Sequence, residues 1–286
     1  MPRGTRAGTR TATRGRAESV EWGRRKLLAL LAGAAVLVLA LLVGLGLSVY
    51  YTLEPGAAVH NDREVVVPAG ATDPRDEIAA RPMASVPPEA ARPGPLTTKP
   101  FGVMVLPGAR RLGAAGVSTG FPQTAQGALA QLVAIDQAAL QSASVPDAQA
   151  VIKAWAAPGG PTAESWSGVR AIAELLAAAG LPASGSPTLT VSATPELGLI
   201  KGTVGLAYVV ACVDFVVTAT VTTTARVAAA DCQRMIWSED PVQLSGRAAG
   251  EGRWLIGPGP EPAQPPSVWP GTQAAHSAGY RELTYE

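Results

Sequence analysis

Residues 207–237 have the sequence AYVVACVDFVVTATVTTTARVAAADCQRMIW. Apolar and β-branched side chains fill two runs, 207–221 and 225–237, and such side chains fit the pleated, half-buried surface of a sheet. A turn centred near Thr222 would join the two runs. The sequence therefore predicts a long antiparallel hairpin at the centre of the fold.

The two cysteines of the chain, Cys212 and Cys232, lie twenty residues apart on the two arms of this hairpin. Directly opposed residues on antiparallel strands approach to about 4.5–5.5 Å, which a disulfide can span. Two buried free thiols on neighbouring strands are the alternative. The N-terminal segment, described below, predicts a membrane topology in which both cysteines lie outside the cytoplasm. Disulfides persist there, so we expect a bridge.

The flanking sequence changes from helical to strand periodicity. Shorter strands are predicted at 188–193, 198–204 and 253–256. Before them, apolar residues recur at helical spacing in three segments: 125–142 after the N-cap Thr124, 146–155 opened by Pro146, and a third helix capped by Thr162 and ended by Gly180. Helices followed by antiparallel strands predict an α+β fold, with about three helices packed on one face of a curved sheet.

Residues 27–49 contain no charged side chain, and this length matches the roughly 20 residues that a helix needs to cross a bilayer. Residues 1–26 hold eight Arg or Lys against two Glu, which predicts a cytoplasmic N-terminus. We expect one transmembrane helix at 27–51, with everything after it extracytoplasmic. The expected membrane-interface residues are Trp22, Arg24, Arg25, Lys26, Tyr50 and Tyr51.

Other interpretations of the N-terminal region stay open. A cleaved secretory signal would have a shorter apolar run, of about 7–15 residues, before a small-residue site. Small residues fall near one face of the predicted span, which allows self-association of the helix. The N-terminal arginines could touch anionic lipid or nucleic acid, although an orientation signal accounts for the same charges.

The composition divides the rest of the chain. Residues 52–100 are proline-rich and predict an extended extracytoplasmic stalk. Residues 101–257 carry the predicted α+β domain. Residues 258–286 begin as a second proline-rich, irregular tail, for which Trp269 is the expected anchor onto the domain.

The order of these parts resembles a known family. A short cytoplasmic tail, one anchor, a stalk, and then helices followed by a bent sheet are similar to the bitopic, TcpC-like assembly proteins of conjugative transfer and type IV secretion systems in high-GC Gram-positive bacteria. The resemblance is carried by residues 120–140, 207–237 and 253–259. It implies a cone-shaped, nuclear-transport-factor-like extracytoplasmic domain and a role in complexes with other transfer subunits.

Few residues point to catalysis. The only histidines, His60 and His276, lie outside the predicted helices and strands, so no histidine-based metal site is expected in the core. Residues 116–120 match the hydrolase pattern G-x-S-x-G around Ser118, but they lack the preceding strand and the following helix that a nucleophile elbow needs.

Two carboxylates lie within the apolar strands. Asp214 is expected to share a strand face with the cysteines, and Asp231 to face the other way. Carboxylates inside this kind of cone act as bases in its isomerase members. Without a second polar group at matching spacing, pairing with Arg226 or Arg234, or solvation, is the simpler interpretation.

These observations predict a non-enzymatic, membrane-anchored scaffold or channel component, with no cofactor, no metal, no small-molecule substrate and no direct contact with nucleic acid. An envelope ligand-binding or transporter-accessory protein that uses the cavity of the cone is the alternative, and an isomerase-like or hydrolytic enzyme is a third possibility. The expected core aromatic residues are Trp155, Trp166, Trp237 and Trp254.

Overall fold

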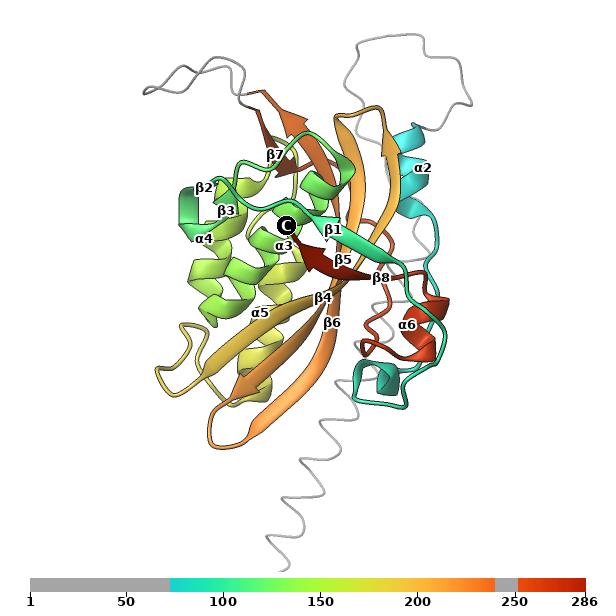
Figure 1. Cartoon of the computed structure of the whole chain (residues 1–286). Helices are drawn as coiled ribbons and strands as arrows, with labels where there is room; N and C mark the ends of the chain where they lie inside the picture. The colour runs from blue at the N-terminus through green and yellow to red at the C-terminus, as the bar shows by residue number, and fades with distance from the viewer. Residues whose placement is uncertain (1–72, 240–251) are drawn as a thin grey trace, which may run out of the picture. The chain divides into compact units, whose positions relative to one another are not determined.

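The computed structural model describes residues 73–239 and 252–286, which form a mixed α+β domain with a curled, largely antiparallel sheet (Figure 1). The order of the strands in the six-stranded sheet is β1-β8-β4-β5-β6-β7. The strands are β1 (Val103–Leu106), β4 (Thr190–Val204), β5 (Tyr208–Thr220), β6 (Thr224–Ser238), β7 (Arg253–Ile256) and β8 (Arg281–Tyr285). A separate small hairpin pairs β2 (Arg111–Leu112) with β3 (Ser118–Thr119).

The central hairpin forms as the sequence predicts. β5 and β6 pair in an unbroken antiparallel register from Tyr208 opposite Ile236 to Thr220 opposite Thr224. This register sets Cys212 directly opposite Cys232, and the two are joined by a disulfide. The predicted bridge is therefore confirmed.

One long strand, β4, replaces the two short strands predicted at 188–193 and 198–204. Its pairing with β5 shifts register between Pro195 and Leu197 and again between Ile200 and Gly202. Proline cannot donate a ladder hydrogen bond, so a strand that contains one usually carries an irregularity at that point. The two irregularities keep the strand continuous and bend it, which contributes to the curl of the sheet.

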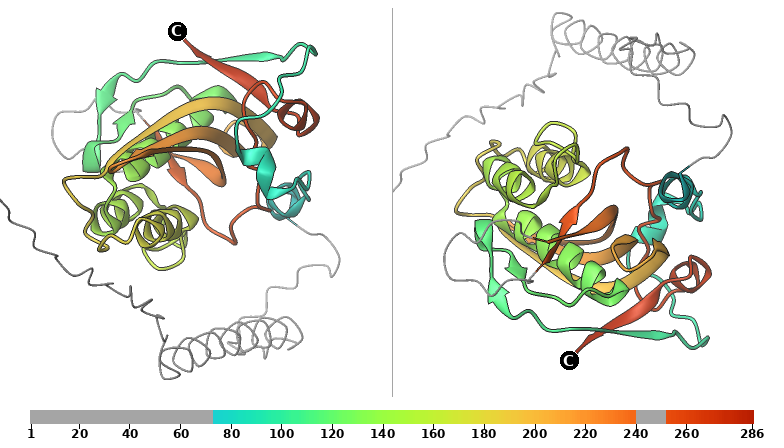
Figure 2. Two further views of the ribbon diagram at one scale, coloured as in Figure 1. Left: turned by 90° about the horizontal axis from the view of Figure 1, so that it is seen from below. Right: turned by 90° about the horizontal axis from the view of Figure 1, so that it is seen from above.

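Three helices cover one face of the sheet (Figure 2): α3 (Ala125–Ser142), α4 (Val145–Trp155) and α5 (Ser167–Ala178). The hydroxyl of Thr124 accepts a hydrogen bond from the N–H of Gly127, as expected of an N-cap. α5 begins later than predicted. Thr162 does not cap it but forms a turn with Glu164 and Ser165, and Trp166 occupies the N-cap position.

The tryptophans pack between helices and sheet as predicted. Trp155, Trp166 and Trp254 are fully buried, and Trp237 is half-buried with its ring edge-on to that of Trp254 at 5.4 Å. Two of the indole N–H groups are satisfied by backbone: Trp155 donates to the carbonyl of Ala114 and Trp254 to that of Pro122.

The segment before the domain differs from the predicted stalk. Residues 52–72 lie outside the described residues, but residues 73–100 fold against the sheet instead of extending away from it. They form α2 (Pro74–Ala80) and a 3₁₀ turn, η1 (Pro88–Ala91). The side chain of Asp73 caps α2 and a proline occupies its first turn, so proline here starts a helix rather than preventing one.

The C-terminal segment is likewise part of the fold and not a loose tail. Residues 257–270, here called the proline-rich strap, cross to a short helix, α6 (Gln273–Ser277), which leads into β8. β8 pairs in parallel with β1 and antiparallel with β4. The predicted boundary at residue 258 is wrong because β8 pairs with residues more than 80 positions earlier in the chain, which no local pattern reveals.

Within residues 73–239 and 252–286, none of the helices has the length and hydrophobicity of a membrane span. The predicted transmembrane helix at 27–51 and its interface residues lie outside these ranges.

Candidate functional site

A cavity of about 160 Å³ lies between helices α3 and α5 and the sheet. Asp136 enters it from α3, Trp166 and Ser167 from the start of α5, and Asp231 from β6. Phe215 and Ala229 supply apolar wall. The cavity is partly open, and it combines two carboxyl groups with apolar wall and with further polar side chains, among them those of Arg170 and Glu174.

Hydrogen bonds hold the carboxylate of Asp231 in place. One oxygen accepts from the hydroxyl of Ser167 at 3.0 Å, and the other accepts from the side-chain amide of Gln233 at 2.9 Å. Burial raises the pKa of Asp231 to about 6, against the lowering effect of these hydrogen bonds. Near neutral pH this side chain is mostly ionised and fixed in orientation.

Asp136 lies deeper, with an exposed fraction of 5%. Its Oδ2 atom is buried and has no hydrogen-bond partner. Burial raises the pKa of Asp136 well above its usual range, and the negative charges of Asp231 and Glu261 raise it further. Burial therefore favours the protonated form of the Asp136 carboxyl group over its charged form.

Sequence reasoning missed Asp136, although its position carries a signal. It lies on the apolar stripe of α3, one turn from Leu132 and one turn from Leu140. An aspartate on a buried helix face is uncommon unless it has a partner or a task. The polar neighbours of Asp231 thus come from the sheet as well as from the helices: Gln233 lies two residues further along β6, and Asp136 comes from α3.

A second buried polar atom without a partner belongs to Trp166, a residue that lines the same cavity. Trp166 has an exposed fraction of 1%, and its indole N–H donates to no acceptor. The next residue, Ser167, donates its backbone N–H to the carboxylate of Glu261 at 2.7 Å. The proline-rich strap thereby caps α5 and brings a third acidic side chain close to the cavity.

Asp214 lies on the opposite face of the sheet, as the strand alternation predicts. Its carboxylate accepts a hydrogen bond from the backbone N–H of Val268 at 2.8 Å, and burial raises its pKa to about 8. Neither arginine proposed as a partner contacts these aspartates. Arg234 pairs with Asp76, and Arg226 lies over the ring of Trp269, 5.2 Å from its centre.

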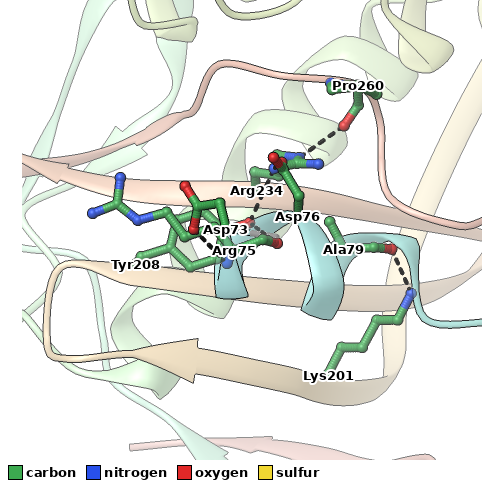
Figure 3. Close-up of polar contacts among 8 residues, drawn as sticks. All are labelled: Asp73, Arg75, Asp76, Ala79, Lys201, Tyr208, Arg234 and Pro260. Carbon is green, nitrogen blue, oxygen red and sulfur yellow. Dashed lines mark hydrogen bonds and ion pairs between the residues drawn. The ribbon is translucent and has the colours of Figure 1, made fainter. Parts of the chain in front are cut away.

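Several contacts attach α2 to this second face (Figure 3). Arg234 lies 2.6 Å from Asp76 and also donates to the carbonyl of Pro260. The hydroxyl of Tyr208 donates to the carbonyl of Arg75, and the ammonium group of Lys201 donates to that of Ala79. These contacts tie α2 and the proline-rich strap to the central strands.

The open edge of β1 is the second candidate surface. In the described part of the chain β1 is the last strand on its side of the sheet, and Val103 and Val105 are about half exposed. The N–H groups of Glu282 and Glu286 donate to the carbonyls of Gly102 and Leu106. Because backbone groups alternate along a strand, those of Val103 and Val105 point away from β8, toward the open side.

No protein-family model, curated protein or solved structure matches this chain. Its function is therefore inferred from the geometry of the described residues and from the predicted topology.

The remaining predicted features are distributed as follows. Ser118 lies in β3, and α3 begins only at Ala125, so no helix follows the serine directly. His276 lies in α6 with its ring edge-on to Phe101, and His60 is outside the described residues. Among residues 73–239 and 252–286, no group of three or more His, Cys, Asp or Glu side chains could hold a metal ion.

Proposed function

We propose that the chain is a non-enzymatic, membrane-anchored component of a conjugative transfer or secretion complex. In this proposal the helix at 27–51 anchors it, and a cone-type extracytoplasmic domain contacts other subunits. The observation that carries the proposal is the open, apolar edge of β1. The layout of the chain, which resembles that of TcpC-like assembly proteins, supports the choice of complex.

An unpaired strand edge is a template for another strand, and proteins that do not use such an edge keep it very short or protect it with proline, charge or a bulge. β1 is short, and it lacks the chemical devices. The four residues of β1, VMVL, contain no proline and no charge. We therefore infer that an extended segment of another subunit pairs with β1 and extends the sheet, with its side chains against Val103 and Val105.

The edge is rigidly supported, which reduces the entropy lost on binding. Met104 and Leu106 alternate with the exposed valines and are buried in the main core. β8 holds β1 from its other side. A groove beside β1 is lined in part by Arg110, Arg281 and Glu286, so it offers charged contacts of both signs to a bound segment.

The test uses the full-length chain in cells with the complex. A photo-crosslinking residue at Val103 should capture another subunit, and Val105→Lys should abolish the crosslink and reduce transfer or secretion at least tenfold. Val227→Lys, at an exposed valine of the central hairpin, is the matched control and should leave both unchanged. Normal transfer by a stably folded Val105→Lys variant would refute the proposal.

A second candidate function is supported by a different observation. The cavity between α3, α5 and the sheet, with the Asp231 carboxylate held in place by Ser167 and Gln233, favours an envelope protein that binds a small ligand, and the two functions are compatible in one chain.

A further inference from the structure

We propose that the segment which pairs with β1 is β1 of a second copy of this chain, so that two copies join their sheets edge to edge. This inference rests on the proposed function, because it names the partner of the same strand edge. It is carried by the opposite charges at the two ends of β1, those of Arg281 and Glu286, which match when the strand pairs with itself.

The hydrogen bonds of β1 fix the register of such a pair. The carbonyls of Gly102 and Leu106 accept from β8, so the backbone groups of Val103 and Val105 point to the open side. In an antiparallel ladder, residues of this kind lie opposite one another, and each pair exchanges two hydrogen bonds. A two-fold axis at Met104 therefore sets Val103 of each copy opposite Val105 of the other.

This register also gives the best use of the exposed side chains. Val103 and Val105 are 54% and 50% exposed and lie on one face of the sheet. A two-fold axis normal to the sheet keeps the valines of both copies on the same face, where they cover one another as cross-strand pairs. A pair centred on Val105 instead would set Val103 opposite Pro107, which has no N–H to donate.

The charged residues lie at opposite ends of β1. The side chain of Arg281 lies against Gly102, since a Cβ added to this glycine would be 3.5 Å from Cγ of Arg281. The N–H of Glu286 donates to the carbonyl of Leu106 at the other end. Both residues are exposed and line the groove beside β1. Because the register sets Gly102 opposite Leu106 of the other copy, it brings Arg281 beside Glu286 of the other copy at each end of the pair.

Other arrangements lack this match. Parallel pairing of two β1 strands in register would set Arg281 beside Arg281 and Glu286 beside Glu286. A partner segment of one charge would meet a like charge at one end of the strand, whereas a second copy in the antiparallel register meets none. Arg110 also lines the groove, but it comes four residues after the end of β1, beyond the residues that pair.

The symmetry of the contact limits the assembly to two copies at this edge. A two-fold interface uses the same surface on both copies and closes, so it gives a dimer and not a filament. The paired strands are short, which makes the contact a weak one when the copies diffuse freely. Anchoring of both copies in one membrane, as the predicted topology has it, would raise their effective concentration.

Crosslinking of the full-length chain, purified in lipid nanodiscs and in detergent, tests the inference. A photo-crosslinking residue at Val103 should give a covalent dimer, and mass spectrometry should locate the crosslink at or next to Val105 of the second copy. A dimer crosslinked elsewhere, or no dimer, would overturn the inference. This measurement uses the natural charges and does not depend on the folding of charge variants.

Reversal of single charges tests the pairing of Arg281 with Glu286. Arg281→Glu or Glu286→Arg sets like charges together at both ends of the strand pair, so each should lower the yield of crosslinked dimer about tenfold. A mixture of the two variants should restore it, because both ion pairs of the mixed dimer again join opposite charges. Lys153→Glu, at an exposed position of α4, is the control and should leave the yield unchanged.

The remaining outcomes separate this inference from the proposed function. A yield insensitive to Arg281→Glu and Glu286→Arg would assign the dimer to another contact, such as the predicted helix at 27–51. In cells, a crosslink from Val103 to a different protein and none between copies would overturn this inference and leave the proposed function. A dimer through β1 together with normal transfer by Val105→Lys would do the reverse.

Discussion

The carboxylate of Asp76 lies 2.6 Å from the guanidinium group of Arg234, and this ion pair joins α2 to β6. The Arg234 side chain is 6% exposed, whereas that of Asp76 is 54% exposed. A cation buried in the sheet thus has its counter-charge on a helix at the surface. Residues 73–81 therefore belong to the folded domain.

Replacement of Asp76 by asparagine should lower the free energy of unfolding by about 1–2 kcal/mol. The substitution leaves the buried Arg234 without a negative partner, and the half-exposed position of Asp76 keeps the loss below that of a fully buried pair. Urea unfolding of the full-length chain measures it. Glu77→Gln, at an exposed acidic neighbour on the same helix, should change stability by less than about 0.5 kcal/mol. Equal effects of the two substitutions would contradict this role for the ion pair.

Loss of the Cys212–Cys232 disulfide should destabilise the domain by about 3 kcal/mol. The bridge closes a loop of twenty residues and so restricts the unfolded chain. The paired substitution Cys212→Ala with Cys232→Ala should lower the denaturation midpoint. Reductant should lower the midpoint of the natural chain toward that of the variant and leave the variant itself unchanged. A midpoint insensitive to reductant in both proteins would count against this contribution.

The parts of the fold that the sequence predicts correctly depend on local signals. The central hairpin follows from two β-branched runs around Thr222, and α3 follows from the cap at Thr124 and its apolar spacing. β8 was not predictable in this way, because its partners are β1 and β4, far away in the chain. The proline-rich composition of residues 73–100 and of residues 257–270 suggested extended segments. In both places the chain instead packs on the sheet.

The candidate site shows the same limit. Strand alternation correctly separates Asp214 from Asp231, since neighbouring strand positions alternate between faces. It cannot show that Asp136 of α3 faces Asp231, because the packing of a helix over a sheet depends on long-range contacts. An aspartate within the apolar stripe of a helix was the one available hint.

Gly127 should not tolerate a side chain. A methyl group there would overlap the backbone carbonyl of Pro122, which also accepts the indole N–H of Trp254. Gly127→Ala should therefore destabilise the domain by about 2 kcal/mol or more, although alanine favours helices over glycine by about 1 kcal/mol. Thermal unfolding and the tryptophan emission spectrum measure the effect. Gly108→Ala is the control, since nothing lies within 4 Å of the added atom, and it should be neutral.

Stability should fall as the pH rises from about 5 to 8, and Asp214 should account for part of this slope. Its pKa is about 8 in the folded domain because the carboxyl group is buried, and about 3.9 in an unfolded chain. Between these values the folded state holds a proton that the unfolded state has released, so each pH unit costs up to about 1.4 kcal/mol. Asp214→Asn keeps an acceptor for the N–H of Val268 and cannot ionise. Urea unfolding across this range should therefore show a smaller slope in Asp214→Asn than in the natural chain, whereas Asp147→Asn, at an exposed aspartate, should retain the full slope. Parallel slopes in all three proteins would mean that Asp214 ionises in the folded domain without penalty.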